Sequence, residues 1–381
     1  MKVPFVDLRA QYKGLEEEML SLVKGVMDDG DYVYSKKIDK LEEEITEYLG
    51  LRPEDRAISV SSGTTALETC LQAAGIKPFD KVLVPSNSFI ASAFAVSNAG
   101  GIPVFFDIDP DTWVWNVRDV MRYLDKDHSI FGVMPVHLYG LPVPGMERLV
   151  EYCSSRRVVV IEDCAQAFGA STEQGNKVGT IGHVNAFSFY PTKNMGTIGN
   201  GGLVASKFGF YNKAARLKKN YGESSKYYSD VVGNNYNMST VQAVVLSLFL
   251  RKIDEWNEKR AQAGRWYREA IDASPVLKEN LRYQKGPLKT HIYHLFVIEV
   301  VRELRDKLLG HLRENDIGAA LHYPLAIHEQ KAYVAGDISL NTPSPVAEEL
   351  TKCIVSLPMH PNLTKEQVTY VCSSIEDFFN A

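Results

Sequence analysis

The chain has 381 residues, 45% of them hydrophobic and 23% charged, which is typical of a soluble globular protein with a sizeable core. Its 42 basic and 47 acidic residues give a net charge of −5 and leave no basic surplus for nucleic acid. Apolar runs are too short for a membrane span, and the N-terminal residues lack a signal-peptide core. The five cysteines are spread out and form no Cys-x-x-Cys pair, so we expect a cytoplasmic protein without a zinc site.

Two helices are predicted near the start of the chain, over residues 15–25 and 36–49, because apolar residues recur there at helical spacing. Seven short β-rich runs follow: AISVSS, KVLVPS, GIPVFFDID, FGVMPVH, RVVVIED, NAFSFYPT and GGLVAS. Several are almost continuously apolar, as in strands that are buried on both faces. Helices predicted over 65–74 and 146–154 lie between these runs, so we expect a mostly parallel α/β sheet.

The pattern changes after Ser239. A long helical stretch without proline is followed by the strand IYHLFVIEV, by the helix RELRDKLLGHLREND, and by a last helix and strand. We therefore predict a large α/β domain over residues 1–245 with a seven-stranded, mostly parallel sheet flanked by helices. A smaller C-terminal α+β domain would cover residues 246–381.

In an open α/β sheet, ligands bind beyond the carboxyl ends of the strands, so the residues after each strand are candidates for a site. The segment SSGTTAL follows the first strand. There Gly63 would let the backbone approach a ligand, and Thr64 and Thr65 would add N–H groups and hydroxyls at a helix N-terminus, which suits a phosphate. An ordinary helix cap would explain the same residues.

Three more candidates follow later strands. Phe89 could stack on a flat ligand, although a core aromatic residue is the commoner explanation. Asp163 comes after four apolar residues and Glu162, where a buried carboxylate needs a partner, unless it only caps the next turn. Lys193 follows NAFSFYPT, and partial burial there would lower its pKa and make the amine a nucleophile, whereas an isolated loop lysine would be solvated.

Together these residues match one ligand, pyridoxal 5′-phosphate. Its aldehyde condenses with a lysine, its ring nitrogen pairs with a carboxylate, and its ring and phosphate need a flat neighbour and N–H donors. Four glycines near the lysine would let the chain pass close to cofactor and substrate: Gly196, Gly199, Gly201 and Gly202.

Ten segments in order along nearly the whole chain resemble the sugar aminotransferase family named after DegT, DnrJ, EryC and StrS, within the fold-type I pyridoxal phosphate enzymes. They are FVDLRAQY, SSGTTAL, VPSNSFIASAFAV, FFDIDPDTW, PVHLYG, VIEDCAQAFGA, SFYPTKNMG, GNNYNMSTVQA, LHYPLAIHEQKAY and LPMHPNLTKEQ. The resemblance implies that Lys193 bonds to the cofactor and that Asp163 pairs with its ring nitrogen. It also implies that Gln166 contacts the ring or its phenolic oxygen and that Phe89 stacks on the ring.

The phosphate contacts that the resemblance implies are Thr64, Thr65 and Ser188, together with Asn235 from the neighbouring subunit. Each active site would therefore need a homodimer. Three positions depart from the family pattern and bear on the substrate side: Asn200 stands where Asp or Glu is common, Asn237 where Arg is usual, and Ser35 where Gly is usual.

The resemblance further implies amino transfer from L-glutamate to a nucleotide-linked keto sugar, for an amino sugar of a polysaccharide such as O-antigen or of a glycosylated natural product. The FYPTKN motif is most similar to members that act at carbon 3 of a 6-deoxyhexose, expected on thymidine diphosphate. Tyr190, His322 and Tyr323 would contact the sugar.

Four alternatives remain open at this point. Two keep the chemistry and change the acceptor, to a 4-keto sugar nucleotide or a keto-cyclitol. Another fold-type I enzyme, such as a lyase or desulfurase, would need a catalytic cysteine on a mobile loop, whereas Cys164 adjoins Asp163 and is expected to be structural. A cofactor-binding regulator without enzymatic activity would be favoured by loss of the lysine, and Lys193 is present.

Overall fold

The computed structural model describes residues 1–334 and 339–381. Its main sheet has eight strands in the order β1-β7-β6-β5-β4-β2-β3-β12. All neighbours from β6 to β12 pair in parallel, whereas β7 pairs antiparallel with both β1 and β6. The strands are β1 Ile58–Val60, β2 Lys81–Pro85, β3 Ile102–Phe106, β4 Ile130–Val133, β5 Val159–Asp163, β6 Val184–Ser188, β7 Gly202–Ala205 and β12 Leu340–Asn341.

Apolar residues cover the sheet on both faces, as the continuous runs predicted. On β2, Val82 and Val84 belong to the core under one set of helices, and Leu83 between them belongs to the core on the opposite face. The first set comprises α4 Gly63–Ala73, α5 Ala91–Asn98 and α8 Gly209–Lys219, and the opposite set includes α6 Val117–Leu124 and α7 Met146–Ser155. The mostly parallel α/β fold is confirmed, with eight strands instead of seven because β12 extends the edge beside β3.

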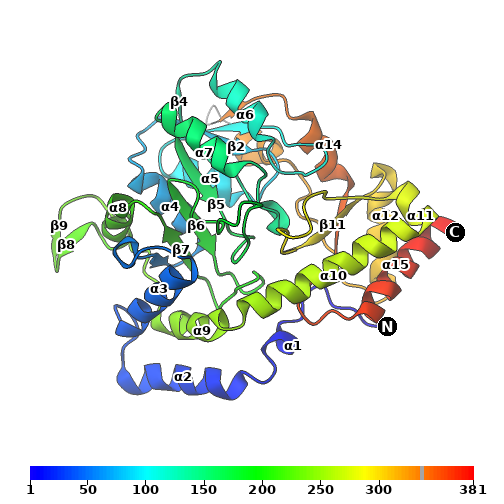
Figure 1. Cartoon of the computed structure of the whole chain (residues 1–381), viewed down its shortest axis with the longest axis horizontal. Coiled ribbons are helices and arrows are strands. Elements are labelled where there is room, and N and C mark those ends of the chain that lie inside the picture. Colours follow the sequence, from blue (N-terminus) through cyan, green and yellow to red (C-terminus); the bar gives the residue numbers. More distant parts are fainter. Residues whose placement is uncertain (335–338) are drawn as a thin grey trace.

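Helices that precede β1 and helices that follow α8 complete the layers around this sheet. They are α1 Leu8–Tyr12, α2 Glu16–Asp29, α3 Lys36–Tyr48, α9 Thr240–Leu250 and α10 Ile253–Ala273. Residues of α3 and α9 form a core with Phe187 of β6 and Leu203 of β7. The long α10 then crosses from this core toward the C-terminal part of the chain, and both termini lie near its far end (Figure 1).

A second, antiparallel sheet of three strands lies in the C-terminal part, in the order β10-β11-β13. Its strands are β10 Arg282–Tyr283, β11 Phe296–Glu299 and β13 Ile354–Leu357. The remaining helices of this part are α11 Pro275–Asn280, α12 Arg302–Glu314, α13 Lys331–Val334, α14 Pro345–Cys353 and α15 Lys365–Asn380. The predicted boundary at 245/246 falls inside α9 and stays a prediction, and β12 pairs with the main sheet although it belongs to the later range.

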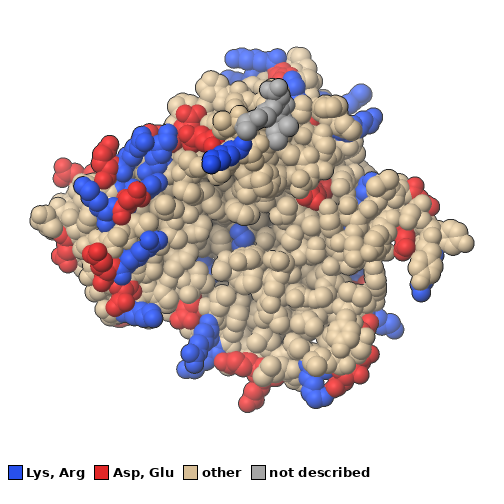
Figure 2. Space-filling view, turned by 180° about the vertical axis from the view of Figure 1, so that it is seen from behind, with Lys and Arg blue, Asp and Glu red and all other residues tan. Residues whose placement is uncertain are grey.

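The surface carries charges of both signs. In Figure 2, acidic and basic side chains lie mostly around the rim of one face, and other residues cover most of its middle. A hairpin of β8 Glu223–Ser225 and β9 Tyr228–Ser229 projects from the side of the main sheet (Figure 1). Across residues 1–334 and 339–381, no helix combines the length and apolarity that crossing a membrane requires.

Candidate active site

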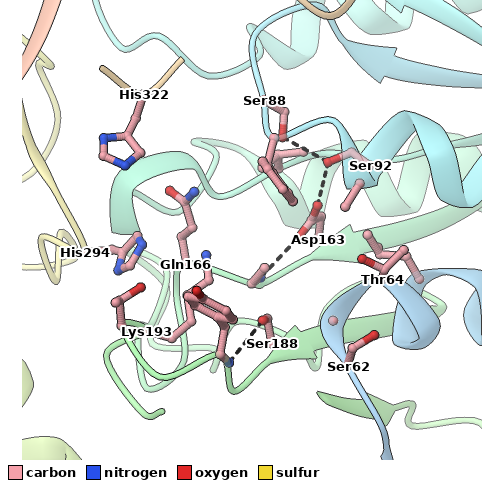
Figure 3. A pocket seen from close by; sticks show the side chains of 18 of the residues that line it. Ser62, Thr64, Ser88, Ser92, Asp163, Gln166, Ser188, Lys193, His294 and His322 are labelled. Carbon is pink, nitrogen blue, oxygen red and sulfur yellow. Dashed lines mark hydrogen bonds between the residues drawn. The ribbon is translucent and has the colours of Figure 1, made fainter. Parts of the chain in front are cut away.

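A cavity of about 460 Å³ lies beyond the carboxyl ends of β2, β5 and β6, where the sequence predicted a site (Figure 3). Residues from the C-terminal part of the chain, among them His294 and His322, close it from the other side. Ten of the predicted site residues line this cavity: Gly63, Thr64, Phe89, Asp163, Gln166, Ser188, Tyr190, Lys193, His322 and Tyr323. Thr65 and Asn235 are not among its lining residues.

The start of α4 forms one wall of the cavity. A Cβ atom at Gly63 would lie 2.6 Å from the Cβ atom of Ser188, so glycine lets the helix N-terminus abut the end of β6. The first N–H groups of a helix have no intrahelical acceptor, and in the described part of the chain those of Gly63 and Thr64 have no other acceptor. Together with the hydroxyls of Thr64 and Ser188, they form a site suited to a phosphate.

The hydroxyl of Thr65 is engaged in a helix cap. It accepts a hydrogen bond from the Ser62 N–H at 3.0 Å and donates to the Ser62 carbonyl at 2.9 Å, while the Ser62 hydroxyl accepts from the Thr65 N–H at 3.1 Å. This reciprocal arrangement is a capping box, which fixes where α4 begins. The Thr65 hydroxyl thus has a capping role, and its phosphate contact stays a prediction.

Asp163 ends β5, and its buried carboxylate is held by two donors. Ser92 of α5 donates its hydroxyl proton to Oδ2 at 2.7 Å, and the N–H of Ala165 donates to Oδ1 at 3.1 Å. The Ser88 hydroxyl lies 2.9 Å from that of Ser92 and extends the chain (Figure 3). Burial raises the pKa of Asp163, and these hydrogen bonds act in the opposite direction.

Ser92 was not predicted from the sequence, because it lies 71 residues from Asp163 along the chain. One signal was present: Ser88 and Ser92 are four residues apart, the spacing that places two side chains on one side of a helical turn. That spacing does not say which strand end the pair would meet.

Lys193 lies in the loop after β6, with its backbone N–H bonded to the Tyr190 carbonyl at 2.8 Å. Burial lowers the pKa of its amine to about 8, and the nearby carboxylate of Asp163 opposes that effect. A Cβ atom at Gly202 would lie 2.1 Å from the Ser62 carbonyl oxygen, so this predicted glycine does mark a close approach of two backbones. Lys193 lines the cavity, and its lowered pKa gives the amine a larger neutral, nucleophilic fraction near pH 7 than an ordinary lysine has.

Gln166 is fixed by partners from both parts of the chain. Its Oε1 accepts a hydrogen bond from the Tyr139 N–H at 2.6 Å, and its Nε2 donates to the Tyr323 hydroxyl at 3.2 Å. Phe89 is 51% exposed, and its ring centroid lies 5.5 Å from that of Tyr323. Because Phe89 is open to the cavity, its ring is available to stack on a flat ligand, unlike an ordinary core aromatic residue.

His322 approaches the cavity from the C-terminal part. Its Nδ1 lies 2.9 Å from the Ser356 hydroxyl, and its ring stacks on Phe5 with the centroids 5.5 Å apart. Burial, and to a smaller extent the charge of Lys193, lowers the pKa of His322 to about 4. The ring is therefore neutral near pH 7 and can exchange hydrogen bonds with a polar ligand.

Glu162 and His137 form a buried pair behind the site. His137 Nε2 lies 2.9 Å from Glu162 Oε2, and His137 Nδ1 accepts from the Val143 N–H at 3.0 Å. The Glu162 carboxylate also accepts N–H bonds from Gly179, Ile181 and Gly182. Cys164 lies close enough to complete a metal-ligand triad, yet every one of these histidine and carboxylate atoms is already hydrogen-bonded, so the pair braces the end of β5.

Asn235 lies outside the cavity and is exposed. Its Oδ1 accepts a hydrogen bond from Asn237 Nδ2 at 3.1 Å, and Asn237 also contacts Asn220 Oδ1 at 3.2 Å. Ser35, another departure from the family pattern, caps α3 by accepting the Lys37 N–H at 3.1 Å. Asn200, the third departure, lines the cavity and so can bear on the substrate.

The cavity thus offers the groups that the predicted cofactor needs. A carboxylate and an amine lie at the ends of adjacent strands, a helix start offers N–H groups without an acceptor in the described part of the chain, and a half-exposed ring, Phe89, lines the same cavity. Gly63 leaves the close approach that a phosphate requires. These residues fit pyridoxal 5′-phosphate.

Comparison with known proteins gives the same result independently. Residues 13–376 match the DegT/DnrJ/EryC1/StrS aminotransferase family. The chain belongs to this family. It is a pyridoxal phosphate-dependent aminotransferase, and relatives within its family act on nucleotide sugars.

Two curated relatives and one solved structure are similar to this aminotransferase over almost its whole length. The UDP-N-acetyl-3-dehydro-alpha-D-glucosamine 3-aminotransferase of Acidithiobacillus ferrooxidans is 34% identical, covering 98% of this chain and 97% of the relative. The dTDP-3-amino-3,4,6-trideoxy-alpha-D-glucose transaminase of Streptomyces venezuelae is 33% identical over 99% and 96%. The crystal structure of S. venezuelae DesV superposes with a TM-score of 0.91 at 32% identity, over 100% and 99% of the two chains. These matches confirm the fold-type I aminotransferase architecture.

The lowered pKa of Lys193 makes a pH prediction for the aminotransferase. The amine becomes neutral as the pH rises through about 8, compared with 10.5 for an ordinary lysine. The rate at which cofactor-free protein bonds pyridoxal phosphate should therefore rise with pH and level off above about pH 9. Stopped-flow absorbance between about pH 6 and 10 measures this rate. A rate that still climbs tenfold per pH unit at the upper end would show a solvated lysine.

Proposed function

We propose that this aminotransferase transfers an amino group from L-glutamate to carbon 3 of a keto-6-deoxyhexose linked to thymidine diphosphate. The observation that carries the proposal is the joint placement of Lys193, Asp163 and the N-terminus of α4 around one cavity. Both curated relatives described above carry a 3-amino or 3-aminotransferase designation, which supports carbon 3. The trideoxyglucose relative and the FYPTKN motif support the deoxyhexose and the thymidine nucleotide.

The product would be an amino sugar destined for a polysaccharide such as O-antigen or for a glycosylated natural product. When bound, pyridoxal phosphate supplies an electron sink and a carrier for the amino group. Lys193 would bond to it at rest. Once the amino donor has freed its Nζ, Lys193 would take a proton from the donor α-carbon and deliver it to the carrier carbon, and the reverse order would serve the keto sugar.

The neighbours of Lys193 would support this proton transfer. Asp163, held by Ser92 and the Ala165 N–H, would keep a negative charge against the ring nitrogen. Gln166 would present its amide to the ring from a position fixed by Tyr139. Phe89 would cover the ring and exclude water from that side, since its ring is exposed to the cavity.

The sugar would occupy the side of the cavity that the C-terminal part closes. Tyr190 is 52% exposed at the end of β6, and its hydroxyl would bond to a sugar hydroxyl or a phosphate. His322 and Tyr323 would approach from the opposite wall. Because two segments far apart in the chain supply these contacts, the sugar would bridge the two parts.

A homodimer would complete each site. Asn235 is exposed and does not reach the cavity of its own chain, so a phosphate contact by Asn235 requires a second copy. Asn237 would orient its amide from behind. All five cysteines are buried free thiols, which suits a cytoplasmic enzyme.

The substrate is tested with purified isomers. We expect transfer from glutamate to the thymidine-linked 3-keto-6-deoxyhexose to exceed transfer to the 4-keto isomer, because a site that bonds one hydroxyl rejects an analogue without it by as much as about 10⁴ in kcat/KM. Mass spectrometry of the amino-sugar nucleotide formed from ¹⁵N-glutamate measures the rate of transfer to each isomer. Uridine-linked 3-keto sugars and a keto-cyclitol complete the panel. A higher kcat/KM for the 4-keto sugar or the cyclitol would overturn the carbon-3 proposal.

A further inference from the structure

His294 was not predicted from the sequence, yet it lines the same cavity as Lys193 (Figure 3). It is 6% exposed and precedes β11 by two residues. Its Nδ1 lies 3.1 Å from Asn194 Oδ1, and Asn194 directly follows the lysine in the chain. The opposite ring nitrogen, Nε2, has no hydrogen-bond partner among residues 1–334 and 339–381.

The hydrogen bonds behind His294 have fixed directions. Asn257 Nδ2 donates to the Phe168 carbonyl at 3.0 Å, so its Oδ1 is left to accept from Asn194 Nδ2 at 2.7 Å. Asn194 Nδ2 also donates to the Ile292 carbonyl at 3.3 Å. Backbone carbonyl oxygens only accept, and rotating either amide would bring two oxygens together.

It follows that Asn194 Oδ1 is an acceptor and that His294 Nδ1 carries the proton. The neutral ring then has a lone pair on Nε2. Burial, followed by the charges of Lys193, Arg260 and His322, lowers the pKa of His294 well below its usual value, so the ring stays neutral. The carbonyls of Phe168 and Ile292 thus fix the two amides so that His294 presents a hydrogen-bond acceptor, Nε2, to the cavity.

The neighbouring histidine is not constrained in this way. His322 Nδ1 bonds to the Ser356 hydroxyl, which can donate or accept. Either neutral tautomer of His322 can therefore form, depending on whether the ligand donates or accepts a hydrogen bond. The two rings can serve different partners: His322 a substrate group of either kind, and His294 a hydrogen-bond donor.

Among the described residues that line the cavity, Lys193 carries the positively charged donor, beside neutral donors such as Tyr190 and Asn200. Its Nζ makes no hydrogen bond within the described ranges, it lines the same cavity as His294, and its charge is the first among the charged groups that act on His294. We propose that His294 Nε2 accepts a hydrogen bond from the Lys193 ammonium group during proton transfer, which makes His294 a positioning residue. The bond between the donor α-carbon and hydrogen would break, the proton would bond to the lone pair of Lys193 Nζ, and the electron pair left on carbon would pass to the electron sink that the bound cofactor supplies. One N–H of the resulting ammonium group would point at His294 Nε2. No proton passes to the histidine.

This inference rests on the proposed role of Lys193, and its test is separate from the sugar acceptor. The holoenzyme labelled with ¹⁵N-histidine should show one ring with a protonated Nδ1 and an unprotonated Nε2 from about pH 6 to 9, which disappears in His294→Asn. A protonated Nε2 on that ring would overturn the proposal. This readout needs neither turnover nor a sugar, so it stands even if every keto sugar in the panel fails.

Two variants then measure the effect on proton transfer. Asparagine at 294 can reproduce the Nδ1 bond to Asn194 and has no atom at Nε2, whereas glutamine can place an amide oxygen there. We expect His294→Asn to slow the single-turnover half-reaction with glutamate by about 10- to 100-fold, with a larger effect of α-deuteration and little change in glutamate affinity. His294→Gln should recover part of the rate. An unchanged rate and isotope effect in a folded His294→Asn protein would contradict the proposal.

Discussion

Replacing Lys193 with alanine should lower turnover by at least about 10⁴-fold, because the same amine would hold the cofactor and move the proton. The fold should survive, since the amine makes no hydrogen bond within the described ranges and lines a cavity. Steady-state rates with glutamate and the preferred keto sugar measure the loss. Thermal unfolding, compared with that of the unmodified protein, measures the stability.

Arginine at 193 is the matched control, because it keeps a positive charge and cannot condense with the cofactor aldehyde. Both variants should bind pyridoxal phosphate reversibly, so dialysis should remove it. If Lys193→Ala retained even a tenth of the original rate, another amine would have to perform these steps. The assignment of Lys193 would then fail, whereas family membership would stand.

Asp163→Asn has the second-largest expected effect. The amide can keep the hydrogen bond from the Ala165 N–H, and it removes the negative charge that would hold the ring nitrogen protonated. We expect kcat to fall by about 10³-fold, which at about 1.4 kcal/mol per tenfold corresponds to about 4 kcal/mol of barrier. Equilibrium binding of the cofactor, followed by its visible absorbance, should change far less than kcat.

Ser92→Ala separates the charge of Asp163 from its orientation. It deletes one donor at 2.7 Å and leaves the carboxylate in place, so its effect on kcat should be far smaller than that of Asp163→Asn. A near-normal kcat for Asp163→Asn would show that the residue caps a turn, the alternative that the sequence left open.

The main sheet could be predicted because its strands are buried on both faces and therefore read as apolar runs. The predicted start of α7 at residue 146 matches the structure. The helix α4 begins two residues before its predicted start, because the capping box places its first turn at Gly63. The edge strand β12 was missed, since Leu340 and Asn341 are exposed and only pairing with β3 makes them a strand. The long stretch after Ser239 divides into α9 and α10 at Arg251 and Lys252, where no proline or glycine marks a break.

The site was predictable where chemistry follows a strand, as at Asp163 and Lys193. Residues that act through tertiary contacts were not predictable: Ser92 is supplied by a helix, and His294 by the segment just before β11, far along the chain. The tautomer of His294 depends on the orientation of two amide side chains, Asn194 and Asn257. The carbonyls of Phe168 and Ile292 set that orientation. No local pattern in the sequence carries that information.

The central claim is that this cavity holds the cofactor with Lys193 bonded to it. The most direct measurement is reduction of the holoenzyme with borohydride, followed by proteolysis and mass spectrometry of the labelled peptide. The account predicts one cofactor-derived mass increase per chain, on Lys193, and its absence when Lys193 is replaced by alanine. A label on any other lysine, with Lys193 unmodified, would contradict the account.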